Sequence, residues 1–296
     1  MFYRLSNSWR LFGATLDVLR KDKELMLFPL LSGLAAILLV ASFAGGMWGF
    51  GLIDQLRTSY EANNGELTPR EFAPVVVLGL LFYFVNFFIV IYFNAALVGA
   101  ARIRLRGGDP TVADGFAAAN RCLPAILGYS LIAATVGLIL NALQNRARDN
   151  FLGRIVVGLI GMAWTLITYL VVPVLVIERL GPLAAIRRSA SMLRETWGEQ
   201  IIANFGFGMI GFAFSLVGFA IAGGGVFLAT QAGFGIAFAV AAVALAVLYW
   251  IVLSLVLSSL RGIYTAALYC YAANDEVRGF PVELVSEAFS PRIGPR

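Results

Sequence analysis

The distribution of charge is the feature that most constrains this chain. All 22 Lys and Arg residues and all 17 Asp and Glu residues lie outside six long apolar stretches. A helix needs about 20 predominantly apolar residues to cross the hydrocarbon core of a bilayer, and each stretch reaches that length. The sequence therefore predicts an all-α integral membrane protein with six transmembrane helices, over residues 25–53, 72–101, 123–143, 155–177, 200–227 and 233–260.

The last two predicted spans come from one uncharged block. It lies between Glu199 and Arg261 and is too long for a single crossing, but it suits two crossings joined by a short turn. Glycine adopts the backbone conformations that tight turns need. The turn is therefore expected between the glycine run at 223–225 and the Gly-Phe-Gly sequence at 233–235.

Orientation follows from the basic residues that flank the spans. The segments on one side of the six spans contain 17 Lys and Arg residues, and those on the other side contain 5. Basic flanks stay in the cytoplasm, so both termini are expected there and the acidic loop 54–71 outside. Residues 1–24 are charged throughout and the first apolar run is too long for a cleavable signal, so the first span is expected to be a permanent anchor. The expected location is the inner (cytoplasmic) membrane.

Three predicted cytoplasmic segments carry apolar residues at i, i+4, i+7 and i+11, which draws one stripe along a helix. They are residues 4–20, 110–122 and 183–197, and Pro110 and Pro182 are expected at the first helical position of the last two. Such a helix either lies in the membrane interface or packs under the bundle, and both interpretations stay open. The residues singled out on these helices are Trp9, Phe12, Phe116, Arg187, Arg188 and Trp197.

Each of these helices precedes two predicted spans. The chain is therefore predicted to consist of three hairpins, each preceded by a short cytoplasmic amphipathic helix. Residues 1–272 would form the six-span membrane domain, and residues 273–296 would form a cytoplasmic tail.

The predicted spans contain polar residues with two interpretations. Such groups either hydrogen-bond between helices, contributing about 0.6 to 2 kcal/mol each, or line a polar path. Pro173 should bend the fourth span, and bent helices also occur at transporter sites. Glu178, next to Arg179, is interpreted either as a salt-bridged boundary residue or as an acid of an intramembrane hydrolase. The candidates for a polar path or for contacts between helices are Asn86, Asn94, Thr135, Asn141, Pro173 and Glu178.

No residue pattern predicts catalysis. Histidine is absent from the sequence, which removes the commonest general base and the commonest zinc ligand. Cys122 and Cys270 lack CxxC spacing and are expected to be reduced structural thiols near the cytoplasmic boundary. We therefore predict no catalytic residue, metal site or cofactor.

The net charge of +5 is explained by cytoplasmic loops that lie over an anionic leaflet. Membrane lipids are therefore the expected partners, and no nucleic-acid partner is expected. A protein partner or a second copy stays open.

Several motifs carry a resemblance to a known family. They are Ser-Trp-Arg-Leu-Phe at 8–12, Phe-Pro-Leu-Leu-Ser-Gly at 28–33, Gly-Gly-Asp-Pro-Thr-Val at 107–112, Pro-Val-Leu-Val at 173–176 and Thr-Trp-Gly-Glu at 196–199. With them the chain resembles a bacterial and archaeal family of multi-pass membrane proteins of unknown function. More loosely, it is similar to the membrane domain attached to some glycerophosphodiester phosphodiesterases. Neither resemblance implies an activity or site residues, because the soluble barrel of those enzymes has no counterpart in this sequence.

Three functions are compatible with these features. The first is a non-enzymatic membrane protein that acts as a scaffold or interacts with lipids or protein partners. The second is a transporter or channel for a small or lipid-like solute, using the asparagines of the second span and the bent fourth span. An intramembrane enzyme ranks last.

Overall fold

The computed structural model describes the backbone of residues 2–62, 68–231, 233–273 and 275, and their side chains except in 2–11, 62, 69–72 and 193–207. Within these residues the chain is entirely helical, without strands. The elements are α1 (Phe2–Lys21), the 3₁₀ helix η1 (Lys23–Met26), α2 (Leu27–Gly49), α3 (Leu52–Ala62), α4 (Pro69–Leu105), α5 (Val112–Arg121), α6 (Leu123–Arg146), α7 (Phe151–Ile167), α8 (Val171–Ile177), α9 (Pro182–Gln231) and α10 (Gly235–Ala272).

The described residues contain 6 segments long and apolar enough to cross a membrane, which confirms the all-helical prediction and the number of spans. Their side chains are mostly exposed on the isolated chain, as expected of helices that face lipid. The segments are Lys23–Gly49, Ala73–Leu105, Leu123–Arg146, Phe151–Ile177, Gly208–Gln231 and Gly235–Ala272.

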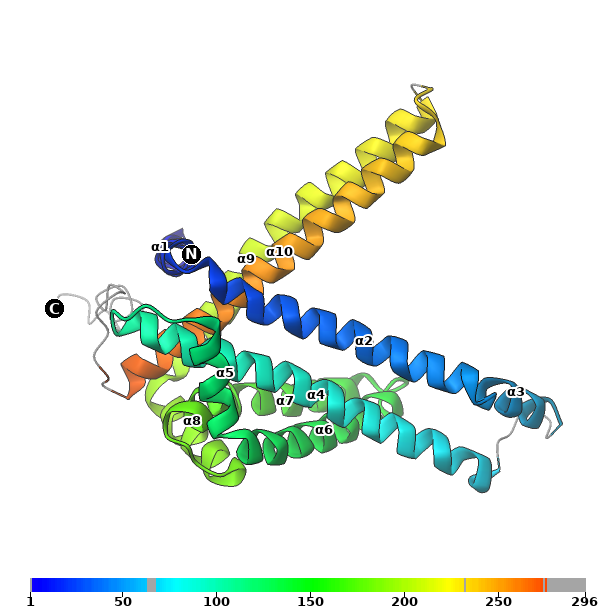
Figure 1. Cartoon of the computed structure of the whole chain (residues 1–296), viewed down its shortest axis with the longest axis horizontal. Helices are drawn as coiled ribbons and strands as arrows, with labels where there is room; N and C mark the ends of the chain where they lie inside the picture. Colours follow the sequence, from blue (N-terminus) through cyan, green and yellow to red (C-terminus); the bar gives the residue numbers. More distant parts are fainter. Residues whose placement is uncertain (1, 63–67, 232, 274, 276–296) are drawn as a thin grey trace.

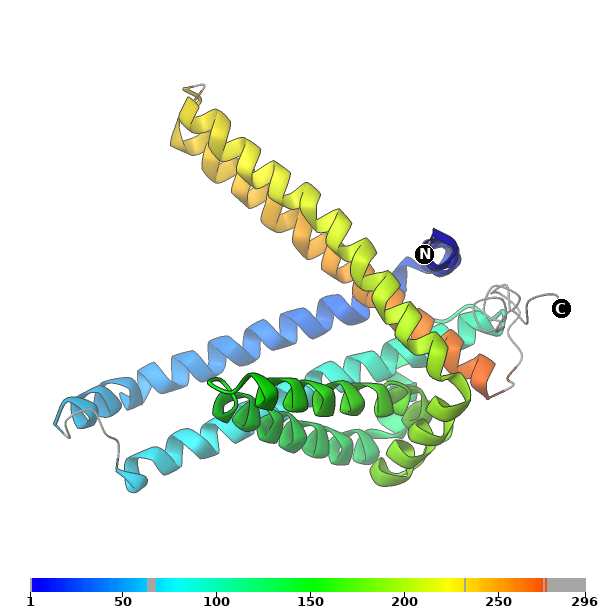
Figure 2. The ribbon, with the colours of Figure 1, turned by 180° about the vertical axis from the view of Figure 1, so that it is seen from behind.

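The helices meet at one junction and extend away from it as separate arms (Figure 1). One arm is formed by α9 and α10, which pack along each other, and it diverges from α2. The shorter pair α6 and α7 lies against α4 on the other side, and the reverse view shows the same arrangement (Figure 2). The N-terminal helix α1 and the C-terminal end of α10 both lie at the junction.

The buried core is concentrated at this junction. The C-terminal part of α4 is almost fully enclosed, from Ala95 to Ala101, and α10 is enclosed around Tyr264. Leu25, Phe28, Leu170 and the other core residues pack against these two helices. Away from the junction large apolar side chains such as Leu38 and Ile236 are 67% and 83% exposed. The junction therefore holds most of the buried core, and the arms leave much of their apolar surface for lipid.

Aromatic packing and close backbone contact fix α5 against α2 and α4. The Phe116 ring lies edge-on to Phe28, with 5.5 Å between ring centroids, and stacks on Tyr92 at 6.1 Å. A Cβ atom on Gly115 would lie 2.8 Å from the Ala96 carbonyl oxygen, so only glycine allows this approach. The Tyr92 hydroxyl also donates to Asn120 Oδ1 at 2.8 Å.

The fourth span is broken into α7 and α8 by a turn at residues 168–170, just before Pro173. A proline cannot donate the hydrogen bond that would continue the helix through this turn. Ser189 of α9 compensates, because its buried hydroxyl donates to the Ile167 carbonyl at 2.6 Å and accepts from the Leu170 N–H at 3.2 Å. One side chain thus satisfies backbone groups on both sides of the break.

The segment 183–197 is not a separate helix. It is the first part of α9, which runs without interruption for 50 residues, about 75 Å at 1.5 Å per residue. The sequence has no proline between Pro182, which is the first residue of α9 as expected, and Gln231. The turn to α10 lies at the later glycine pair, where Gly233 and Gly235 have φ of 73° and 81°.

Two further elements differ from the sequence prediction. The acidic loop 54–71 contains helix α3, which the spacing of apolar residues did not lead us to expect. Helix α5 begins at Val112 rather than at Pro110, because Thr111 and Asp114 form a capping box in which each side chain binds the other residue's backbone N–H.

We predict that Ser189→Ala destabilises the protein by about 1–3 kcal/mol, because it leaves buried backbone groups at the α7–α8 turn without partners. Ser191→Ala is the matched control, since the Ser191 hydroxyl is exposed and donates only to the Arg188 carbonyl of its own helix. Thermal unfolding of both variants in detergent measures the difference. Equal unfolding midpoints would contradict the role given to Ser189.

Candidate functional site

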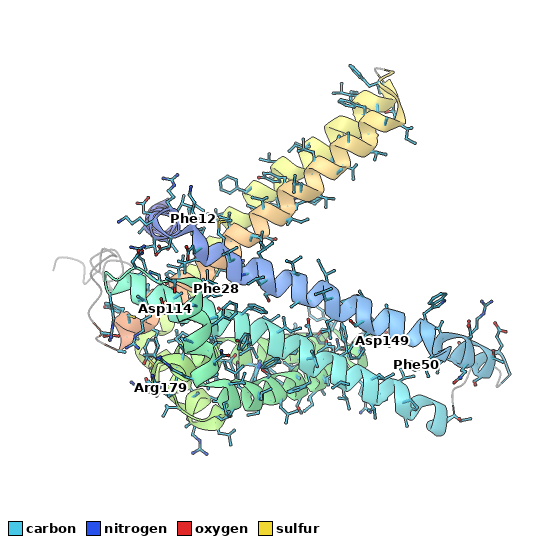
Figure 3. The ribbon with its side chains drawn as sticks, viewed as in Figure 1. Phe12, Phe28, Phe50, Asp114, Asp149 and Arg179 are labelled. Atoms are coloured by element: carbon cyan, nitrogen blue, oxygen red, sulfur yellow. The ribbon has the colours of Figure 1, made fainter. Side chains whose placement is uncertain are left out.

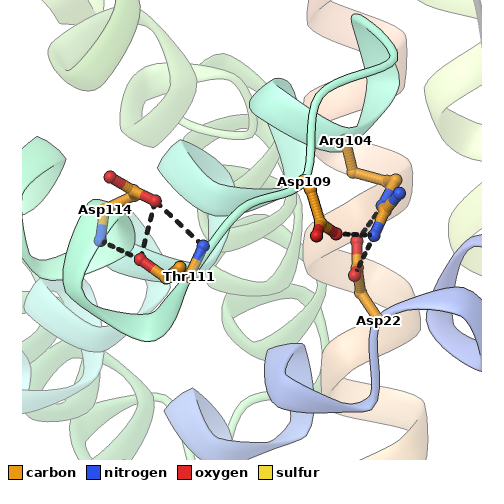
Figure 4. Close-up of polar contacts among 5 residues, drawn as sticks. All are labelled: Asp22, Arg104, Asp109, Thr111 and Asp114. Carbon is orange, nitrogen blue, oxygen red and sulfur yellow. Dashed lines mark hydrogen bonds and ion pairs between the residues drawn. The ribbon is translucent and has the colours of Figure 1, made fainter.

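Charged residues at the junction form a node centred on Arg104, near the end of α4. The Arg104 guanidinium binds both carboxylate oxygens of Asp22, in the α1–η1 connection, and Asp109 Oδ1 at 2.6 Å (Figure 4). Asp22 is buried, whereas Asp109 is exposed. A guanidinium that binds both oxygens of a buried carboxylate fixes the relative orientation of the two side chains as well as the distance between them. The node therefore ties the start of the first span to the end of the second.

The capping box beside this node includes the carboxyl group of Asp114. The hydroxyl and backbone N–H of Thr111 donate to Asp114 Oδ2 at 2.7 and 2.9 Å (Figure 4). These hydrogen bonds hold the pKa of the Asp114 carboxyl below its usual range. The connection between α4 and α5 is thus ordered by Asp109 on one side and by Asp114 on the other.

A second set of ion pairs ties the end of α10 to α4. Asp275, just after α10, accepts from Arg102 at 3.1 Å and from Arg106 at 2.5 Å. Burial alone would raise the pKa of the Asp275 carboxyl, but the hydrogen bonds and charges of Arg106 and Arg102 outweigh it and lower the pKa. Arg102 Nε is buried and has no hydrogen-bond partner among the described residues, so this pairing is incomplete.

Glu178 closes α8 and forms a third set of contacts at the same junction. Its Oε1 atom accepts from Arg188 Nε of α9 at 3.0 Å and from the Tyr269 hydroxyl of α10 at 2.8 Å. These contacts fit a salt-bridged boundary residue, because Oε1 accepts from two donors on two other helices. The carboxylate joins α8, α9 and α10.

A polar cavity of about 230 Å³ lies where α2, α4 and α10 come together. Its only charged lining residue is Arg261, which is exposed and has no hydrogen-bond or ion-pair partner for its guanidinium among the residues that the structure describes. The remaining lining residues are Pro29, Ser32, Val90, Phe93, Asn94, Leu97, Ser258, Gly262 and Thr265. A larger and mostly apolar cavity of about 900 Å³ lies between the far ends of α2 and α4, beside α3.

The polar residues singled out in the spans do not gather at one place. Asn94 lines the polar cavity, whereas Asn86 is half-buried and has no hydrogen-bond partner among the described residues. Thr135 and Asn141 are exposed on α6: the Thr135 hydroxyl donates to Leu131 of its own helix, and Asn141 Oδ1 accepts from Asn145. Pro173 is buried in α8, and Glu178 lies in the contacts described above.

The residues singled out on the cytoplasmic helices also have separate environments. Phe12 and Phe116 pack against the junction core, and Figure 3 shows Phe12 at the junction, with Asp114 and Arg179 there too. In contrast, Phe50 and Asp149 lie at the far ends of the helices (Figure 3). Arg187 and Arg188 are exposed, and Arg188 pairs with Glu178. The side chains of Trp9 and Trp197 lie outside the described residues.

Four residues of the junction, Arg104, Arg261, Ser189 and Asp275, are not predicted as site residues by the sequence. Arg104 and Asp22 were counted only as flanking charges, and nothing in their spacing indicates that the two residues meet. Arg261 carried a signal, because it ends the long uncharged block and is followed at Thr265 by another polar residue on the same helix face.

The described part of the chain has neither a cluster of metal ligands nor an exposed thiol. No group of three or more Cys, Asp or Glu side chains is placed there to hold a metal ion. Cys122 and Cys270 are both buried. Burial raises the pKa of the Cys122 thiol, which disfavours the thiolate that a nucleophile or metal ligand requires.

The lowered pKa of Asp275 predicts a pH dependence. Because the folded pKa is depressed, the carboxylate contributes stability above its unfolded pKa of about 3.9, and this is lost as the pH falls through the folded value. Asp275→Asn should lower the free energy of unfolding by about 1–3 kcal/mol at pH 6. Between pH 6 and pH 3 the variant should then lose less stability than the wild-type protein, because it has no carboxylate to protonate at this position. Thermal unfolding across this range tests it. The control is Asp149→Asn, because Asp149 is exposed and has no ion pair among the described side chains. The prediction would be wrong if the wild-type protein and both variants had the same pH profile.

Comparison with known proteins places the chain in a family. A family model described as "Family of unknown function (DUF6159)" matches residues 73–280. The match begins within α4 and runs past α10, so it includes Arg104, Asp109 and the Glu178 contacts, whereas Asp22 and the motifs at 8–12 and 28–33 lie before it. No curated protein matches the chain. The protein belongs to this family of unknown function.

Proposed function

We propose that the protein is a non-enzymatic multi-pass protein of the inner (cytoplasmic) membrane that acts by interacting with lipids or with a protein partner. The observation that supports this is the position of its charges. The ion pairs centred on Arg104, Asp275 and Glu178 all lie at the junction, and in each of them the arginines are paired with carboxylates. A proton relay or an intramembrane acid pair would need titratable groups at mid-membrane depth, which the apolar spans do not supply.

The junction is proposed to lie at the cytoplasmic surface. It gathers Arg102, Arg104, Arg106 and Arg188, which are basic residues that flank the spans. In this arrangement α1, α5 and the first part of α9 are the three cytoplasmic helices, and each precedes a pair of spans. The far ends, with α3 and the α6–α7 connection, then face outside.

The second candidate function is transport of a small or lipid-like solute. The polar cavity favours it, because Asn94 and Arg261 face a space between three spans. The cavity does not continue to Asn86 or to the polar residues of α6, so a transport path would need a conformational change that opens the junction.

The orientation predicts which positions a membrane-impermeant thiol reagent reaches in intact cells. In a background without Cys122 and Cys270, cysteine at Asn150 should be labelled from outside, and cysteine at Ser191 only after the membrane is permeabilised. Both positions are exposed on the isolated chain, so accessibility reports the side of the membrane. Labelling of position 191 in intact cells would reverse the assignment.

The proposed function predicts that the protein reconstituted in liposomes produces neither ion conductance nor lipid scrambling, while it retains phospholipid through purification. Conductance in planar bilayers, a fluorescent-lipid scrambling assay and native mass spectrometry measure these three properties. Flux that Asn94→Leu abolishes and Asn86→Leu leaves intact would support the transport alternative, because only Asn94 lines the cavity. Absence of both flux and bound lipid would leave only a protein partner.

A further inference from the structure

We infer that the polar cavity between α2, α4 and α10 binds the phosphate group of a phospholipid, with Arg261 as its principal ligand. The inference rests on the proposed function, since it names the lipid chemistry and the place. Among the described side chains, Arg261 is the single cationic residue that lines the cavity, and no described carboxylate lines it.

Arg261 differs in its pairing from the arginines of the junction. Arg102, Arg104, Arg106 and Arg188 all pair with carboxylates, whereas the Arg261 guanidinium has no such partner among the described side chains. Guanidinium groups bind phosphate through two parallel N–H donors, so an unpaired arginine beside a cavity has the chemistry that an anionic headgroup requires.

The other polar lining groups suit the same ligand. Ser32, Ser258 and Thr265 place hydroxyl groups, and Asn94 a carboxamide, around the same space on three helices. The Ser32 and Ser258 hydroxyls and the Asn94 carboxamide can donate to phosphate oxygens, whereas the Thr265 hydroxyl donates to the Arg261 carbonyl at 2.7 Å. The wall behind them is held by close packing, because a Cβ atom on Gly262 would lie 2.9 Å from Leu97 Cγ. The Leu97 side chain of α4 therefore packs directly on the backbone of α10 beside the cavity.

The depth of the cavity agrees with the phosphate layer of a bilayer. A hydrocarbon core of about 30 Å takes up about 20 residues of α10, counted from Gly235, so Arg261 lies about 9 Å beyond its edge, in the headgroup region. On α4, Asn94 lies about 12 Å before Arg102, and on α2, Pro29 lies about 9 Å after Lys23. All three helices thus place the cavity between the charged junction and the apolar arms.

The surroundings of the cavity supply a path for acyl chains. The arms formed by α2 and by α9 with α10 diverge from this point (Figure 1). Ile251, about two turns from Ser258 and on the same face of α10, is 49% exposed, and Leu34 of α2 is exposed to the same extent. A free phosphate would not use these apolar surfaces, whereas a phospholipid would. The proposal is therefore a lipid site rather than a site for inorganic phosphate.

The test uses the delipidated full-length protein in detergent, titrated with phosphatidylglycerol and followed by native mass spectrometry. Arg261→Gln should weaken binding about tenfold or more, because it removes charge-assisted hydrogen bonds. Ser258→Leu, which fills the cavity without changing charge, should weaken it too. Arg121→Gln removes an exposed basic residue of α5 and should change affinity less than twofold. Thermal unfolding midpoints establish that each variant is folded.

The possible results distinguish a wrong assignment of the Arg261 site from a failure of the proposed function. Equal loss in Arg121→Gln and Arg261→Gln would show binding by general surface charge and overturn the site. Displacement of phosphatidylglycerol by equimolar inorganic phosphate would overturn the assignment to lipid. If the wild-type protein binds phosphatidylglycerol and Arg261→Gln binds it equally well, the site is wrong and the proposed function stands. If the wild-type protein binds no phospholipid, the lipid interaction in the proposed function fails with it.

Discussion

The pairing of Arg104 with the buried carboxylate of Asp22 is the interaction on which the arrangement of the spans depends. Spans surrounded by lipid gain nothing from the hydrophobic effect by packing on each other, so their relative positions must come from close packing and from polar contacts. In this chain both are concentrated at the junction, and further contacts join α9 to α10 along their arm. Arg104 connects the first two spans, Asp275 returns α10 to α4, and Glu178 joins α8 to α9 and α10. Beyond the junction the arms diverge (Figure 1).

This division explains why polar residues within the spans contribute little to the architecture. The hydroxyls of Thr135, Thr165 and Ser215 each donate to a carbonyl one turn back in their own helix. A hydroxyl satisfied in this way can face lipid without an unpaired donor. Contacts between spans come instead from Tyr249 and Trp250 of α10, which donate to backbone carbonyls of α9 at 2.8 and 3.3 Å.

Hydropathy and charge were sufficient to predict the fold class and the six spans, because burial in lipid imposes length and apolarity on each helix separately. They could not predict which charges meet. Asp22 and Arg104 are far apart in sequence, and their contact depends on how α2 and α4 pack. The same limit applies to Ser189, whose role follows from the break at residues 168–170 and from the position of α9 beside it. Asn94 was anticipated as a polar residue in a span, but only the packing of three helices places Arg261 near it.

The unpaired Arg261 is also informative about energetics. Arg261 lies at the end of an apolar span, where a membrane limits the water that can solvate an unpaired guanidinium, and this costs free energy. Pairing with a carboxylate of the chain would remove that cost, as it does for Arg102, Arg106 and Arg188. Among the described residues the chain supplies no such carboxylate, but the bilayer supplies phosphate at this depth. The cavity is thus completed electrostatically by the membrane, so the stability of the junction and the lipid composition around it are coupled.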